Sequence, residues 1–305
     1  MTRGLRLKFG VAVVCASVTG CAHGRRGPGL GGDVKGGLVD VGGGASLVYD
    51  ATGQGRTVVL IHGGLLDRKM WDAQFAGFAR QFRVVRYDTR WHGESGGSVG
   101  PWSDYEDLRL LLDHLGVTRA AIVGLSMGGG IAIDFALAHP ERADAVVAVS
   151  SGLSGFEFPD TSASPHAARM GAAWAQGDVE GVAEAFQRMW TDGPRREPGQ
   201  VDAAVRTSVR AMLRRGVARA LKRPRAQELQ PPAIGRLREI RAPMLVLVGE
   251  LDMPDIHTIA GRLVADVPGA RRVVIPGAAH MINMEQPAEF ARAVLDFLAP
   301  AHPAD

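Results

Sequence analysis

Continuous runs of aliphatic and β-branched residues recur along the chain, and helix-length segments separate most of them. The apolar runs lie at residues 57–61, 83–88, 120–125, 145–149, 244–248 and 272–275. Segments with apolar residues at helical spacing lie at residues 72–80, 103–115, 127–138, 257–267 and 287–298. Because apolar strands alternating with helices are typical of a parallel sheet covered on both faces, this pattern predicts an α/β fold.

One long stretch, residues 152–235, interrupts the alternation and shows no strand pattern. Compact domains rarely contain so long a loop without structure of its own. Apolar spacing predicts helices at residues 167–176, 179–190 and 201–221, with prolines marking the breaks between them. We therefore expect a helical cap, residues 152–235, inserted over the end of a core formed by residues 45–151 and 236–299.

The N-terminal segment has a different pattern. Arg3, Arg6 and Lys8 precede an apolar run at residues 9–18, which is too short for a permanent membrane-spanning helix. A basic start followed by a short apolar run is typical of an export signal. Residues 1–20 are therefore predicted to be a signal peptide.

The apolar run ends in Val18-Thr19-Gly20-Cys21, which resembles the lipobox of bacterial lipoproteins. The resemblance implies lipidation of Cys21 and a membrane-anchored lipoprotein of a bacterial cell envelope. The alternative is an ordinary secretory signal and a soluble secreted or periplasmic protein. Residues 21–44 are rich in glycine, which predicts a flexible tether and a fold that begins near Ala45.

Composition limits the kinds of partner and site. The 305 residues include 35 Lys and Arg against 32 Asp and Glu, a net charge of +3, and this small excess predicts no nucleic-acid partner. Removal of residues 1–20 would take away three bases and no acid, so the remaining charges balance. The two cysteines, Cys15 and Cys21, form neither a disulfide framework nor a four-thiolate zinc site, so no metal is expected.

Basic residues are concentrated near the predicted cap, where residues 188–241 contain 14 Lys and Arg and only 5 Asp and Glu. The spacing of Arg206, Arg210, Arg214 and Arg215 favours the solvated outer face of an amphipathic helix. The other interpretation is a basic lid that attracts anionic substrates or acidic lipid headgroups.

The segment Gly124-Leu125-Ser126-Met127-Gly128 places a serine between two glycines where a predicted strand meets a predicted helix. This is the arrangement of a nucleophile elbow, in which a tight turn projects the serine hydroxyl out of the sheet. A side chain at either glycine would collide with a neighbouring strand or helix. Ser126 is therefore the candidate nucleophile.

Two further segments support a family resemblance. Val58 to Leu65 includes His62-Gly63-Gly64 directly after an apolar strand, and Asp88-Thr89-Arg90-Trp91-His92-Gly93-Glu94-Ser95 has Trp91 where the family usually has glycine. With the elbow, they make residues 45–299 resemble the α/β-hydrolase family, in particular its capped esterase, lactonase and cofactor-free haloperoxidase-like branch. The resemblance implies a mostly parallel sheet flanked by helices, an inserted helical cap and no cofactor. We expect Trp91 to narrow the mouth of the site, or else simply to pack against the surface.

The resemblance also implies the partners of Ser126, because the family order is serine, acid, histidine. Asp252 follows the strand at residues 244–248 and matches the family's acid position, with Glu250 and Asp255 as alternatives. His280 follows the last strand and matches the base. The oxyanion hole of such a site needs two backbone N–H groups, which here are those of Gly64 and Met127.

Serine at the elbow, where epoxide hydrolases and dehalogenases of the family carry aspartate, indicates acyl chemistry. The sequence thus predicts a hydrolase that cleaves a small-molecule carboxylic ester or lactone through an acyl-enzyme on Ser126. The same three residues are also compatible with a carbon–carbon bond hydrolase, a peptidase or a perhydrolase. An alternative of another class is a membrane-tethered binding protein without turnover.

Overall fold

The computed structural model describes residues 34–98, 100–221 and 224–299, so the predicted signal peptide and Cys21 lie outside the described residues. Within these described residues, eight strands form one sheet in the order β1-β2-β4-β3-β5-β6-β7-β8. Their bounds are Lys35–Asp40 (β1), Ser46–Thr52 (β2), Thr57–Ile61 (β3), Arg83–Tyr87 (β4), Ala120–Leu125 (β5), Ala143–Val149 (β6), Met244–Gly249 (β7) and Arg271–Ile275 (β8). Strands β3 to β8 pair in parallel, whereas β1 and β2 are antiparallel to their neighbours. The predicted fold, a mostly parallel sheet flanked by helices, is confirmed.

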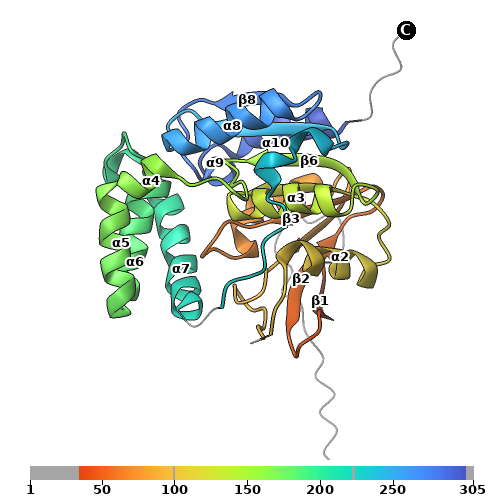
Figure 1. Ribbon diagram of the computed structural model, residues 1–305, viewed down its shortest axis with the longest axis horizontal. Coiled ribbons are helices and arrows are strands. Elements are labelled where there is room, and N and C mark those ends of the chain that lie inside the picture. The colour runs from red at the N-terminus through yellow and green to blue at the C-terminus, as the bar shows by residue number, and fades with distance from the viewer. Residues whose placement is uncertain (1–33, 99, 222–223, 300–305) are drawn as a thin grey trace, which may run out of the picture. The chain divides into compact units, whose positions relative to one another are not determined.

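Helices cover both faces of this sheet (Figure 1). Helices α2 (Asp104–His114), α3 (Met127–Ala138) and α8 (Pro254–Asp266) contribute to one apolar cluster, and α1 (Asp72–Phe78) and α10 (Pro287–Leu298) to the other. The central strands β5 and β7 are buried along their whole length, because side chains of both faces pack beneath helices. This explains their continuous apolar sequences.

The stretch between β6 and β7 is helical, as its sequence predicts, and its helices group together beside the sheet in Figure 1. The elements are α4 (Pro159–Ala163), α5 (Pro165–Gln176), α6 (Val179–Phe186), the π-helical turn η2 (Gln187–Thr191) and α7 (Ala203–Ala220). Short 3-10 turns are η1 (Arg68–Trp71), η3 (Pro198–Gln200), η4 (Ala233–Gly235) and η5 (Leu237–Glu239), and α9 (Ile282–Glu285) is a single turn before α10. Among the described residues, no helix is both long and apolar enough to cross a bilayer.

The predicted start of the fold at Ala45 is wrong. Strand β1 begins at Lys35, inside the segment assigned to the tether, and pairs with β2 along its full length. Val39 and Val41 are 3% and 5% exposed, so this segment contributes to the core. The glycine-rich sequence hid the strand because pairing with β2, rather than local propensity, stabilises it.

Candidate active site

Ser126 lies between β5 and α3 with φ 55° and ψ −114°, a conformation that only a sharply turned chain imposes on a residue with a side chain. A Cβ on Gly124 would lie 2.0 Å from the carbonyl oxygen of Gly128, and one on Gly128 would lie 2.4 Å from that of Ile61. Both glycines are therefore needed for close backbone packing, as the sequence predicts. The Ser126 carbonyl accepts hydrogen bonds from the N–H groups of Gly130 and Gly152, which hold the turn in place.

The structure brings Asp252 and His280 together at the carboxyl ends of β7 and β8. Nδ1 of His280 lies 3.0 Å from each carboxylate oxygen of Asp252, and both side chains are almost completely buried. A carboxylate only accepts hydrogen bonds, so Nδ1 carries a proton, and in the neutral imidazole the lone pair is on Nε2. Asp252 also accepts the N–H of Met253 at 2.8 Å, which fixes one carboxylate oxygen.

The two alternative acids have other roles. Glu250 accepts the N–H of Gly277 at 2.9 Å, and Asp255 accepts the N–H groups of Asp160 and Thr161 at the start of α4. The carboxylate that contacts the imidazole is that of Asp252.

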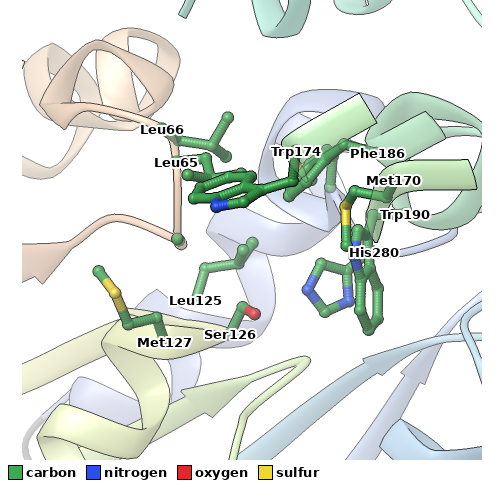
Figure 2. Close-up of a pocket in the computed structure, with 13 residues that line it drawn as sticks. Leu65, Leu66, Leu125, Ser126, Met127, Met170, Trp174, Phe186, Trp190 and His280 are labelled. Atoms are coloured by element: carbon green, nitrogen blue, oxygen red, sulfur yellow. The ribbon is translucent and has the colours of Figure 1, made fainter. Parts of the chain in front are cut away.

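Ser126 and His280 both line a pocket of about 330 Å³, and the serine hydroxyl points toward the imidazole (Figure 2). The core contributes the floor, including Leu125 and Met127, and the cap contributes Met170, Trp174, Phe186 and Trp190. His280 is the one ionisable side chain in this lining, so the pocket is apolar around a single polar pair.

Gly64 and Met127 also line the pocket. A Cβ on Gly64 would lie 3.9 Å from Cβ of Met127, so the two backbone segments are adjacent. Met127 is the first residue of α3, and its N–H therefore belongs to the first helical turn, which has no intrahelical acceptor. The next residue of the loop, Leu65, has φ 62°, which marks a sharp turn directly after Gly64.

Beneath this loop, His62 connects two backbone segments. Its Nδ1 lies 2.8 Å from the carbonyl oxygen of Gly63, and its Nε2 accepts the N–H of Thr89 at 3.0 Å. Complete burial lowers the pKa of His62, which keeps the imidazole neutral and Nε2 available as an acceptor. His62 therefore supports the loop.

The expectation that Trp91 narrows the site mouth is wrong. Trp91 has φ 65°, and a Cβ on Gly97 would lie 2.1 Å from its ring, so the indole packs flat over Gly97. Trp91 is not among the residues that line the described pocket.

The aromatic residues of the pocket wall, Trp174, Phe186 and Trp190, come from the cap. Their helical spacing is visible in the sequence, but the face that they turn toward Ser126 depends on how the cap packs. The ring of Trp190 lies 4.5 Å from that of His280 between centroids, at 42°. No motif in the sequence identifies this contact.

The arginines of the cap form ion pairs within the protein. Arg206 pairs with Asp192, Arg210 with Glu180 and Glu184, Arg214 with Glu180, and Arg215 with Asp67 of the core. None of these four arginines lines the described pocket.

Known proteins share both the sequence pattern and the architecture. Residues 58–293 match the model of the alpha/beta hydrolase family. The 3-oxoadipate enol-lactonase 2 of Acinetobacter baylyi is 28% identical over 255 residues, 82% of this chain and 91% of that protein. A 2-hydroxy-6-oxononadienedioate/2-hydroxy-6-oxononatrienedioate hydrolase of Paraburkholderia phymatum is 31% identical over 266 residues, 82% of this chain and 90% of that protein. The crystal structure of a hydrolase from Pseudomonas aeruginosa has a TM-score of 0.70 and 32% identity, covering 87% of this chain and 98% of that one.

Proposed function

Since the chain belongs to the alpha/beta hydrolase family, we propose that it is a serine hydrolase that cleaves an uncharged carboxylic ester or lactone through an acyl-enzyme. The observation that carries the proposal is the Asp252–His280 hydrogen bond, which assigns the proton of the neutral imidazole to Nδ1, in a residue that lines the same pocket as Ser126. The enol-lactonase of Acinetobacter baylyi is named for cleavage of a lactone, an internal ester.

In this mechanism, His280 Nε2 takes the proton of the Ser126 hydroxyl as Oγ attacks the substrate carbonyl carbon. The carbonyl oxygen becomes an oxyanion, which the N–H groups of Gly64 and Met127 stabilise. Asp252 stabilises the imidazolium, which then protonates the departing alcohol as the ester C–O bond breaks. Water next attacks the acyl group on Ser126, with His280 again as base, and releases the acid and the free serine.

The pocket lining favours an uncharged substrate. Leu65, Met170, Trp174 and Phe186 surround the space next to Ser126 and offer no cation to a carboxylate. Burial of an unpaired carboxylate costs several kcal/mol, so anionic acyl groups should bind poorly. The names of the Paraburkholderia hydrolase and of the Acinetobacter enol-lactonase both include an anionic acid, so neither name is a good model of the substrate here, and the carbon–carbon bond hydrolase ranks second.

A fluorophosphonate probe together with matched esters tests the proposal. The probe should label the wild type and not Ser126→Ala, and only the wild type should hydrolyse 4-nitrophenyl butyrate. The 4-nitrophenyl monoester of succinic acid, of similar size but charged, should be cleaved at least tenfold less efficiently in kcat/KM. Labelling of Ser126→Ala, or absence of any acyl-enzyme from short esters and lactones, would refute the catalytic assignment and favour a binding protein. A preference for the charged ester would refute the substrate class alone.

We also propose that residues 1–20 direct export and that Cys21 carries the lipid anchor. The proposal rests on the basic start, the apolar run and the lipobox-like Val18-Thr19-Gly20-Cys21. An alkyne fatty acid supplied to expressing bacteria should label the wild type and not Cys21→Ser. Equal labelling of both would contradict lipidation at Cys21 and leave the secreted alternative.

A further inference from the structure

A segment of the cap, residues 187–197, lies between the two loops that carry Asp252 and His280. A Cβ on Gly193 would lie 2.6 Å from the carbonyl oxygen of Leu251 and 2.9 Å from Cβ of Ala279. Thr191 and Asp192, next to it, have no exposed surface. The 187–197 segment is therefore packed directly against the residues that precede the acid and the base.

This segment contacts His280 through Trp190. The Trp190 carbonyl accepts the N–H of His280 at 3.3 Å, and the two rings lie 4.5 Å apart between centroids. Trp190 belongs to η2, a π-helical turn, and such turns occur frequently at functional sites. The imidazole is thus held by Asp252 on one side and by the cap on another.

A buried ion pair adds a second contact between the 187–197 segment and the core. Arg196 Nη2 lies 2.6 Å from Oε2 of Glu285, and the two side chains are only 10% and 5% exposed. The guanidinium also donates to the carbonyl oxygens of Thr191, Asp192 and Gly277, at 2.9, 2.8 and 3.2 Å. Arg196 therefore connects the 187–197 segment with the loop between β8 and α9.

Glu285 links Arg196 to Ala279, the residue before the base. Its Oε1 accepts the N–H of Ala279 at 3.0 Å, while Oε2 pairs with Arg196. Burial raises the pKa of Glu285, and the adjacent guanidinium of Arg196 opposes that rise. Without Arg196, the carboxylate of Glu285 would remain buried without a cation. The free-energy cost of this unpaired charge would force the side chain to move or to take up a proton.

We propose that Arg196 is a positioning residue, which sets the place of His280 through Glu285 and the backbone of Ala279. The inference rests on the proposed function, because it concerns the base of the same site. Arg196 does not line the pocket and so acts through His280 rather than on the substrate. The cap accordingly contributes to the geometry of the catalytic base as well as to the pocket wall.

The test compares Arg196→Met with Arg214→Met. Arg214 is likewise a cap arginine paired with a glutamate, Glu180, but its side chain is 58% exposed and does not line the pocket, so it serves as the control. Arg196→Met should lower kcat for 4-nitrophenyl butyrate about ten- to hundredfold, with KM changed less than about twofold, because a misplaced base slows chemistry more than binding. Arg214→Met should keep the wild-type kcat. Equal kcat in the two variants, or a rise in KM alone, would overturn the proposal.

A double variant separates positioning from general stability. In Arg196→Met with Glu285→Gln, the amide oxygen still accepts the Ala279 N–H and no buried charge remains, so kcat should recover at least severalfold over Arg196→Met. A folded double variant with no recovery would overturn the route through Glu285. The double variant also tests the route if Arg196→Met alone fails to fold.

A spectroscopic measurement is independent of turnover. The His280 Nδ1 proton bound to Asp252 should give a low-field proton resonance in the wild type and in Arg214→Met. In Arg196→Met this resonance should shift or broaden, and an unchanged resonance would overturn the proposal. If the wild type showed this resonance but cleaved no ester, the proposed function would fail while the positioning role could still be judged.

Discussion

At the scale of single residues, close packing of the surrounding backbone sets the conformation of Ser126 and the charge state of His62. Ser126 keeps a positive φ because Gly124 and Gly128 let the adjacent chain segments approach to distances that no Cβ would permit. His62 remains neutral because it is buried and because its Nε2 must accept the Thr89 N–H. In both cases the sequence motif names the residue, and its physical state follows from close packing.

Asp134, on α3, provides a pH-dependent prediction at the same scale. Burial raises its pKa to about 6, and the hydroxyl of Ser154 is its hydrogen-bond donor at 2.9 Å. An unfolded-state carboxyl titrates near pH 3.9, so the folded state holds the proton more tightly, and stability falls as the pH rises through this interval. Asp134→Asn should therefore be more stable than the wild type by about 2 kcal/mol at pH 7.5.

Urea unfolding at pH 4.5 and 7.5 would measure this effect. The stability gain of Asp134→Asn over the wild type should shrink as the pH falls toward 4, because the Asp134 carboxyl of the wild type becomes protonated. Asp113→Asn is a useful contrast, since a hydrogen bond from Arg142 lowers the pKa of Asp113 and removal of that carboxylate should slightly destabilise at pH 7.5. A gain for Asp134→Asn that did not change with pH would contradict the assigned cause.

At the scale of elements, α7 packs against the loop that carries Gly64. A Cβ on Gly216 would lie 2.0 Å from the carbonyl oxygen of Leu65, so the helix backbone rests on the loop that carries Gly64. Arg215, beside it, pairs with Asp67 at 2.7 Å on the same loop. The cap therefore touches the proposed oxyanion loop as directly as it touches His280.

Gly216→Ala should displace either α7 or the Leu65 carbonyl. We expect a loss of about 1–3 kcal/mol in unfolding free energy, the usual cost of overpacking, and a fall in kcat of about tenfold through Gly64. Gly171→Ala in α5 is the matched control, because a Cβ there meets nothing within 4 Å and alanine favours the helix. Guanidinium unfolding and steady-state kinetics measure the two effects, and equal behaviour of the variants would argue against the close approach.

At the scale of the whole molecule, the first strand ties the N-terminal residues to the core. Arg90, in a buried ion pair with Asp107, also donates to the carbonyl oxygen of Val41 at 2.7 Å. The segment before Ala45 thus completes both the sheet edge and a buried polar network. The sheet and this network together make residues from Lys35 onward part of the folded core.

A chain that starts at Val34 and one that starts at Ala45 should differ in melting temperature. A chain that starts at Ala45 loses β1 and the burial of Val39 and Val41, at about 1.5–3 kcal/mol for each valine. Its midpoint should be lower by about 10 °C in differential scanning calorimetry, since 1 kcal/mol corresponds to about 2–4 °C in a domain of this size. Equal midpoints for the two chains would show that β1 adds no stability.

Much of the fold could be predicted from the sequence, because it depends on local patterns. The apolar runs of β3 to β8 and the helical spacing of α2, α3 and α10 specify a covered parallel sheet. Ser126 could be named from its motif, and Asp252 and His280 from the resemblance to the family, whose acid and base follow later strands. These features depend on neighbours in the chain, which the sequence displays directly.

Only the tertiary structure decided which residues complete the site. Trp190, Arg196 and Gly216 belong to the cap, and nothing in their local sequence indicates that they contact His280, Glu285 or Leu65. Strand β1 likewise exists only because β2 pairs with it. Contacts between segments far apart in the chain depend on packing of the whole molecule, and a periodic pattern within one segment carries no information about them.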